Sequence, residues 1–152
     1  MISITGDDGG GVERSEKLSM DVPTDGSGPE GIAILVVDDE ADSARVLALM
    51  LGMGGHAVRV AGDGPGALEA ARVSVPALVF LDIGLPGMDG HEVAARMRLL
   101  PGLDAAVLVA LTGFCGDDEQ QRALDAGFDH YLVKPVDPDE IHRLAREVAA
   151  SA

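Results

Sequence analysis

The sequence predicts a single α/β domain built on an open, doubly wound parallel sheet of five strands with five helices. Between residues 32 and 150, five apolar runs of strand length alternate with five segments of helical periodicity. Such continuously apolar runs are typical of parallel strands that helices cover on both faces. The chain is too short for an eight-stranded barrel, so right-handed crossovers favour an open sheet.

The first half of this region gives the signals for three strands and two helices. A continuous apolar run is followed by Ala44, Leu47 and Leu51, whose spacing places them on one face of a helix. A short run then leads through a Gly/Pro turn into a second helical segment, and a third run is apolar throughout. These signals predict strands at 32–37, 57–60 and 77–81, with helices at 41–53 and 67–73.

The second half continues the alternation. A Gly/Pro-rich loop after residue 82 precedes a helical segment, and two further apolar runs are each followed by a segment of helical spacing. These signals predict helices at 91–100, 117–126 and 138–149, with strands at 106–111 and 128–133.

Composition limits the classes of function. The formal charge is 11 − 26 = −15, which argues against direct binding of nucleic acid phosphates. No apolar run approaches 18 residues, so we expect no membrane partner. A lone cysteine, Cys115, excludes an internal disulfide and suits a reducing compartment. The sequence therefore predicts an acidic cytoplasmic protein.

Residues 1–31 differ from the rest of the chain. They hold 7 of the 20 glycines, carry a formal charge of 2 − 7 = −5, and show no apolar periodicity. Such a segment cannot bury enough apolar surface to offset its ordering entropy, so we predict a disordered acidic tail followed by a domain at 32–150. The tail is interpreted as an extension without function, or as the product of an early start with Met20 the true one. A docking role is the alternative.

Polar residues follow four of the predicted strands: Asp38 and Asp39, Asp82, Thr112, and Lys134. Because the carboxyl ends of parallel strands share one edge of the sheet, we expect these side chains to lie close together. Three carboxylates would repel one another unless a hard cation such as Mg²⁺ bound them. A carboxylate beside that cation can act as a nucleophile toward phosphorus.

Lys134 is the only lysine in residues 32–152, which contain eight arginines. A compact ammonium can reach a single carboxylate or phosphoryl oxygen, whereas arginine presents a broad planar fork. We therefore expect Lys134 to be part of the acidic site.

Four segments together resemble the receiver domain of bacterial two-component response regulators. The resemblance covers residues 32 to about 150 and implies the flavodoxin-like strand order 2-1-3-4-5. Segments 82–90 and 126–137 are in detail similar to the terminal receivers of hybrid sensor kinases. The four segments are VVDDE at 36–40, FLDIGLPGMDG at 80–90, LTG at 111–113 and YLVKP at 131–135.

The resemblance implies that Asp82 accepts a phosphoryl group from a phosphohistidine of a sensor histidine kinase or a histidine phosphotransfer protein. It implies Mg²⁺, with Mn²⁺ as a substitute, bound directly by Asp39 and Asp82. Asp38 would act largely through water, and the main-chain carbonyl of Gly84 would complete the protein ligands.

The resemblance also assigns the switch. Lys134 would pair with Asp82 and later with a phosphoryl oxygen, Thr112 would donate its hydroxyl to another, and Tyr131 would turn inward behind Thr112. The bond before Pro135 is expected to be cis. The fourth helix, fifth strand and fifth helix would then change the face presented to an unknown downstream protein.

Two residues differ from those that would favour rapid hydrolysis of the phosphorylated aspartate. Gly84, two residues after Asp82, has no side chain to hold a hydrolytic water, and Phe114 is expected to cover the phosphoryl group. We therefore expect slow self-dephosphorylation. Since the chain ends at Ala152, we expect no output domain. This favours a single-domain response regulator that catalyses only its own phosphorylation and dephosphorylation, and is otherwise no enzyme.

Two other functions remain open. A phosphorylation-independent, receiver-like interaction module would not need the complete set of polar residues. A metal-dependent phosphohydrolase would need a second acid/base aspartate where Gly84 stands.

Residues 62–67 also fit a dinucleotide-binding pattern, but Pro65 removes an amide from the phosphate cradle and Asp63 adds negative charge there. The histidines show no metal-ligand spacing and are expected to be structural or surface residues; they are His56, His91, His130 and His142.

Overall fold

The computed structural model describes residues 31–85, 87–113 and 116–151. The predicted tail therefore lies, apart from Gly31, outside the described residues. The described part contains five strands and five helices in strict alternation. The strands are β1 (Ala33–Val37), β2 (Ala57–Ala61), β3 (Leu78–Asp82), β4 (Val107–Thr112) and β5 (His130–Val133). The helices are α1 (Ala41–Met53), α2 (Gly64–Val73), α3 (Gly90–Met97), α4 (Asp117–Ala126) and α5 (Pro138–Ser151).

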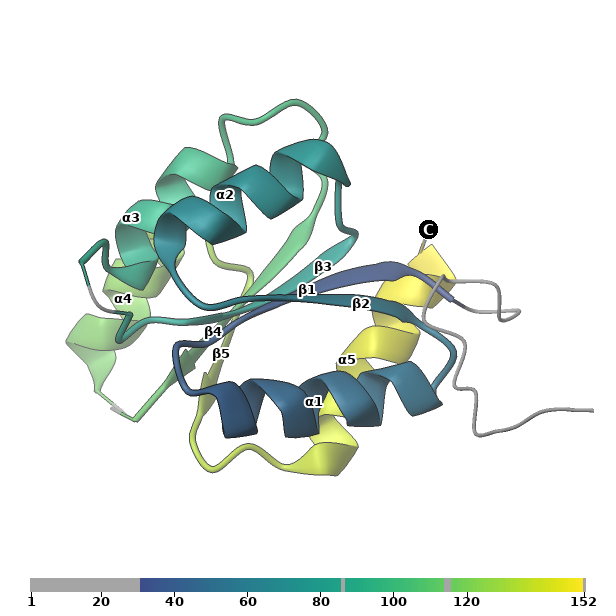
Figure 1. Cartoon of the computed structure of the whole chain (residues 1–152). Coiled ribbons are helices and arrows are strands. Elements are labelled where there is room, and N and C mark those ends of the chain that lie inside the picture. The colour runs from purple at the N-terminus through teal and green to yellow at the C-terminus, as the bar shows by residue number, and fades with distance from the viewer. Residues whose placement is uncertain (1–30, 86, 114–115, 152) are drawn as a thin grey trace, which may run out of the picture.

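The strands form one parallel sheet in the order β2-β1-β3-β4-β5, which confirms the predicted fold class and strand order. Figure 1 shows α1 and α5 on one face of the sheet and α2, α3 and α4 on the other. Alternate residues of the central strands enter opposite cores, because successive side chains of a strand point to opposite faces. Val36 and Phe80 pack on the α1/α5 side, whereas Val37 and Leu81 pack on the other.

Helix α2 begins three residues earlier than predicted. Asp63 caps it by accepting a hydrogen bond from the Gly66 amide at 2.7 Å. Pro65 fits the first turn of the helix, where no intrahelical amide donor is required. Local capping therefore extends the helix into a segment that lacks apolar periodicity.

Three other predicted boundaries are wrong by two or three residues, and one of them is the end of α5, which lies at Ser151 instead of residue 149. Helix α3 ends at Met97 instead of residue 100, since the next residues form tight turns such as the Leu100 amide donating to the Met97 carbonyl. Strand β5 begins at His130 instead of residue 128, because Gly127 and Phe128 donate their amides to the last turn of α4. This is the Schellman arrangement, in which a residue of positive φ ends a helix.

Candidate functional site

The carboxyl ends of β1 and β3 lie side by side because the two strands are paired in register. Val37 of β1 pairs with Leu81 of β3, so the next residue along each strand, Asp38 and Asp82, reaches the same edge of the sheet. Asp39 follows in the turn before α1. The predicted group of acidic residues is thus brought together by strand register.

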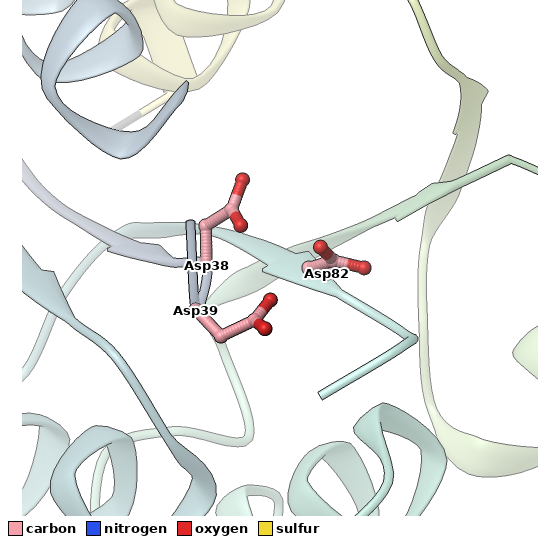
Figure 2. A group of neighbouring side chains, drawn as sticks. All are labelled: Asp38, Asp39 and Asp82. Atoms are coloured by element: carbon pink, nitrogen blue, oxygen red, sulfur yellow. The ribbon is translucent and has the colours of Figure 1, made fainter. Parts of the chain in front are cut away.

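Figure 2 shows the three carboxylates as neighbours at this edge. Each offers an oxygen, and these oxygens all lie within 4.8 Å of one another. Asp38 and Asp82 are only 5% and 9% exposed, whereas Asp39 is exposed. Among the described residues, no other group of three His, Cys, Asp or Glu side chains has this spacing. A set of closely spaced carboxylate oxygens with one solvent-facing member fits a hard, partly hydrated divalent cation.

Lys134 enters this acidic group from the end of β5. Its Nζ donates to Asp82 Oδ2 at 2.8 Å and lies 3.6 Å from Asp38 Oδ2. Its backbone amide donates to the Thr112 carbonyl at 2.7 Å, and the peptide bond to Pro135 is cis. One ammonium therefore faces three carboxylates, which leaves the site with excess negative charge.

Two pKa values reflect this arrangement. Burial raises the pKa of the Asp38 carboxyl above its ordinary value, although the Glu40 amide and the charge of Lys134 oppose the change. Burial would lower the pKa of the Lys134 ammonium, but its hydrogen bond to Asp82 and the nearby negative charges outweigh burial and raise that pKa. The site thus disfavours a further buried negative charge and favours a cation.

Backbone amides hold the two buried carboxylates. The Glu40 amide donates to Asp38 Oδ1 and the Gly84 amide donates to Asp82 Oδ1, both at 2.9 Å. The loop after β3 is closed by Gly90, where a Cβ atom would come within 2.5 Å of Ile83 Cα. Glycine is required there because real side chains do not approach a backbone so closely.

Thr112 and Tyr131 lie on the neighbouring strands β4 and β5. Thr112 is the last residue of β4 and is buried, at 5% exposed. Tyr131 lies in β5, partly buried, against the core on the α2/α3 side. The switch roles of Thr112 and Tyr131 stay predictions, and Phe114, which was expected to cover the phosphoryl group, lies outside the described residues.

Other sequence features do not join the site. The Asp63 side chain occupies the Gly66 amide at the start of α2, so the dinucleotide-like pattern is a helix cap. His56 accepts the Ile32 amide on Nδ1 at 3.2 Å and is buried, as expected of a structural histidine. Cys115 lies outside the described residues.

A groove beside the acidic group was not predicted. It has a volume of about 630 Å³ and runs from Asp38 and Lys134 along α1 to the start of α5. Its apolar lining includes Val46, Met50 and Val136. The sequence did hold a signal for this groove. Val46 and Met50 lie beside the core-facing stripe of α1, at positions where a solvated helix face normally carries polar residues.

The structure thus combines a doubly wound parallel sheet of this strand order with a lysine and three carboxylates at its carboxyl edge. The family model described as "Response regulator receiver domain" matches residues 34–146. The chain therefore belongs to the response regulator receiver family.

Curated relatives agree. An uncharacterized 14.6 kDa protein from Leptolyngbya boryana is 40% identical over 114 residues, which cover 75% of this chain and 87% of that protein. The transcriptional regulatory protein KdpE of Mycobacterium tuberculosis is 40% identical over 117 residues, or 77% of this chain and 50% of KdpE. The chain thus spans about half the length of KdpE.

Solved structures share the fold. The chemotaxis response regulator CheY4 of Vibrio cholerae has a TM-score of 0.72 at 25% identity, covering 76% of this chain and 97% of CheY4. The receiver domain of the sensor histidine kinase PA1611 from Pseudomonas aeruginosa also has a TM-score of 0.72, at 27% identity. The match covers 79% of this chain and 98% of that domain's chain. That structure is described with a magnesium ion coordinated in the active site cleft.

These relatives include a transcriptional regulator, a chemotaxis regulator and a kinase receiver, so the narrower likeness to receivers of hybrid kinases stays a prediction. Among the described residues, no helix combines the length and the apolar character that crossing a membrane requires.

Proposed function

We propose that this protein is a response regulator that accepts a phosphoryl group on Asp82 from a phosphohistidine of a sensor kinase or phosphotransfer protein. The observation that carries the proposal is the contact between Lys134 Nζ and Asp82 Oδ2, made beside two further carboxylates at the carboxyl edge of the sheet. A structural ion pair does not need these extra negative charges, whereas phosphoryl transfer needs a metal-binding nucleophile and a cation together.

The carboxylate set supports Mg²⁺ as the cofactor, with Mn²⁺ as a substitute. Asp39 and Asp82 are proposed as direct ligands, Asp38 as a ligand through water, and Gly84 as the donor of a main-chain carbonyl. This set combines few carboxylates with room for water, as Mg²⁺ prefers. The chemistry that the cation supplies in such a site is neutralisation of charge on phosphoryl oxygens.

The transfer step requires an Asp82 carboxylate oxygen to attack phosphorus in line with the leaving nitrogen. The new O–P bond forms as the P–N bond breaks, and the departing imidazole keeps that electron pair and takes a proton from solvent. Lys134 then exchanges its carboxylate contact for a phosphoryl oxygen, and the Thr112 hydroxyl donates to another. In this scheme the protein catalyses only its own phosphorylation and dephosphorylation.

The groove along α1 supports a protein donor rather than a small molecule alone. One end of the groove is lined by Asp38 and Lys134, and the remainder is lined largely by apolar side chains including Val46 and Met50. Val46 is 58% exposed and lines the groove, so it belongs to an apolar surface that a partner can cover. A donor helix that packs its apolar face here would bring its phosphohistidine to the carboxyl edge of the sheet.

The proposed output is a change in the face formed by α4, β5 and α5. Thr112 is the last residue of β4 and Lys134 directly follows β5, the adjacent strand. New contacts from both residues to a phosphoryl group would therefore displace the ends of both strands. Shifting a two-state equilibrium from 1:99 to 99:1 needs about 5.5 kcal/mol, and charge-assisted hydrogen bonds of roughly 1.5–3 kcal/mol each are of the right size.

The position of Gly84 supports slow self-dephosphorylation. A Cβ atom at residue 84 would lie 3.6 Å from Asp82 Oδ1, so any side chain there would stand beside the phosphorylated carboxylate. Gly84→Asn would supply an amide able to hold a water near phosphorus, and we expect the phosphorylated protein to decay several-fold faster than wild type. An unchanged or longer lifetime, followed by intact-protein mass spectrometry, would refute this role.

The experiment that tests the proposal is incubation with phosphoramidate or acetyl phosphate, with and without Mg²⁺, followed by intact-protein mass spectrometry. Wild type is expected to gain the mass of one phosphoryl group only when the cation is present. Asp82→Asn and Asp39→Asn should not gain it, whereas Asp139→Asn, an exposed control on α5, should behave as wild type. Uptake by Asp82→Asn equal to that of wild type would refute the proposal.

A further inference from the structure

Arg98, the residue directly after α3, forms hydrogen bonds to several chain segments. Its Nη1 donates to the carbonyls of Leu103 at 2.8 Å and Ala106 at 2.6 Å. Its Nε and Nη2 donate to the Gly127 carbonyl at 3.0 and 2.7 Å, and Nη2 also reaches Asp129 Oδ2 at 2.7 Å. The side chain is 21% exposed. A planar guanidinium with five N–H donors suits such a site, whereas an ammonium has three.

The same contacts extend into the sheet. Asp129 Oδ2 accepts the Leu108 amide at 2.9 Å, and the Asp129 amide donates to the Leu108 carbonyl at 2.8 Å. The clamp, defined here as Arg98, Gly127 and Asp129, therefore ties the carboxyl end of α4 to the amino ends of β4 and β5. It lies at the opposite end of these strands from Thr112 and the acidic site.

Gly127 is shaped for this contact. Its φ is +109°, and a Cβ atom there would lie 3.0 Å from Arg98 Cγ. Any other residue would be strained by the backbone angle and would crowd the arginine stem. The last turn of α4 thus ends directly against Arg98.

The rest of α4 buries few side chains. Ala123 is its only buried residue, and Leu124 is 60% exposed. The helix begins at Asp117, five residues after Thr112, and its N-cap residue, Gly116, provides no side-chain capping hydrogen bond. Among the described residues, the hydrogen bonds that join α4 to other segments gather at its carboxyl end, whereas its amino end is the one nearest to Thr112 in the chain.

We infer that Arg98 fixes the carboxyl end of α4 as a pivot, so that a change at Thr112 swings the amino end of the helix while Gly127 stays in place. The inference rests on the proposed function, because phosphorylation of Asp82 is what moves Thr112. Arg98 is a positioning residue in this scheme: it touches no reacting atom and acts through the geometry of α4.

The test maps amide chemical shifts on addition of beryllofluoride and Mg²⁺, which mimic the phosphoryl group. In wild type, the shifts should decline along α4 from Asp117 to Gly127, with the Gly127 and Leu108 amides almost unchanged. In Arg98→Lys, the Gly84 amide should still respond, but the perturbation should spread to Gly127, whose amide should exchange with solvent at least tenfold faster. Arg96→Lys, the same substitution at an exposed ion pair of α3, serves as the matched control.

Each outcome decides a separate question. If the wild-type Gly84 amide does not respond, the phosphoacceptor proposal fails and the pivot fails with it. If Gly84 responds but Gly127 shifts as much as Asp117, the pivot alone is refuted. The pivot is also refuted if Arg98→Lys matches Arg96→Lys in both its chemical-shift pattern and the exchange rate of the Gly127 amide. If Arg98→Lys does not fold, the decline of the wild-type chemical shifts along α4 decides the question.

Discussion

At the scale of single residues, the site combines one ammonium with three carboxylates, and this imbalance has measurable consequences. Asp38 is buried with a raised pKa, while Lys134 has a raised pKa because of the carboxylates around it. The ionised carboxylate of Asp38 therefore lowers the free energy of unfolding of the metal-free protein, whereas the charged ammonium of Lys134 raises it. Both effects follow from linkage between proton binding and folding.

Asp38→Asn is expected to stabilise the protein in the absence of divalent cations. Because the folded pKa of Asp38 lies above its ordinary value of 3.8, the folded state binds this proton more tightly than the unfolded chain. Wild type therefore loses stability as pH rises through that raised pKa, and the variant does not. Denaturant unfolding with a chelator should show a gain for the variant that grows as pH rises above 3.8 and then levels off at about 1 kcal/mol. A destabilised variant at neutral pH would contradict the assignment.

Lys134→Gln is expected to destabilise the protein by about 1–2 kcal/mol, between the values for exposed and buried ion pairs. The folded pKa of Lys134 lies above its ordinary value of 10.5, so its contribution is complete below that pH and is lost as pH rises through the folded pKa. The difference between wild type and variant should therefore be constant at neutral pH and shrink in alkali. Arg122→Gln, at an exposed pair on α4, should change stability little at any pH.

At the scale of elements, the fold and most of the site follow from sequence, and the remainder depends on contacts that sequence does not display. Apolar periodicity predicts every strand and helix, and the position of Asp82 after an apolar run predicts its place at the sheet edge. The early start of α2 was missed because it depends on capping by Asp63. The groove along α1 and the clamp at Arg98 were missed because both join segments far apart in the chain.

Gly90→Ala is a test at this scale, since the turn that positions Asp82 closes on Gly90. The new Cβ would meet Ile83 Cα at 2.5 Å and the Asp82 carbonyl at 2.8 Å, so the loop after β3 must shift. We expect a loss of about 1–3 kcal/mol in unfolding free energy, as for overpacked interiors, together with slower phosphorylation. Gly62→Ala, where a Cβ would meet nothing within 4 Å, should change neither quantity. Equal behaviour of the two variants would exclude this role for Gly90.

At the scale of the whole molecule, cation binding and folding are coupled. A ligand that binds only the folded state stabilises it by about 2.7 kcal/mol at a hundred times its dissociation constant. Mg²⁺ should therefore raise the unfolding temperature of wild type in a concentration-dependent way. The increase in unfolding temperature should be strongly reduced in Asp39→Asn, which lacks a carboxylate of the acidic site, and retained in Asp139→Asn. The two variants are matched because each removes one negative charge from a molecule of formal charge −15. Equal shifts in both variants would indicate nonspecific screening instead of a site.

Chemical reduction locates the phosphoryl group directly on the residue that carries it. Borohydride reduces an aspartyl phosphate to homoserine, so protein treated with phosphoramidate and Mg²⁺, then with borohydride, can be digested and sequenced by tandem mass spectrometry. We predict homoserine at position 82 and at no other aspartate, and none when Mg²⁺ is omitted. Homoserine at a different aspartate, or none under any condition, would contradict the claim that Asp82 is the phosphoacceptor.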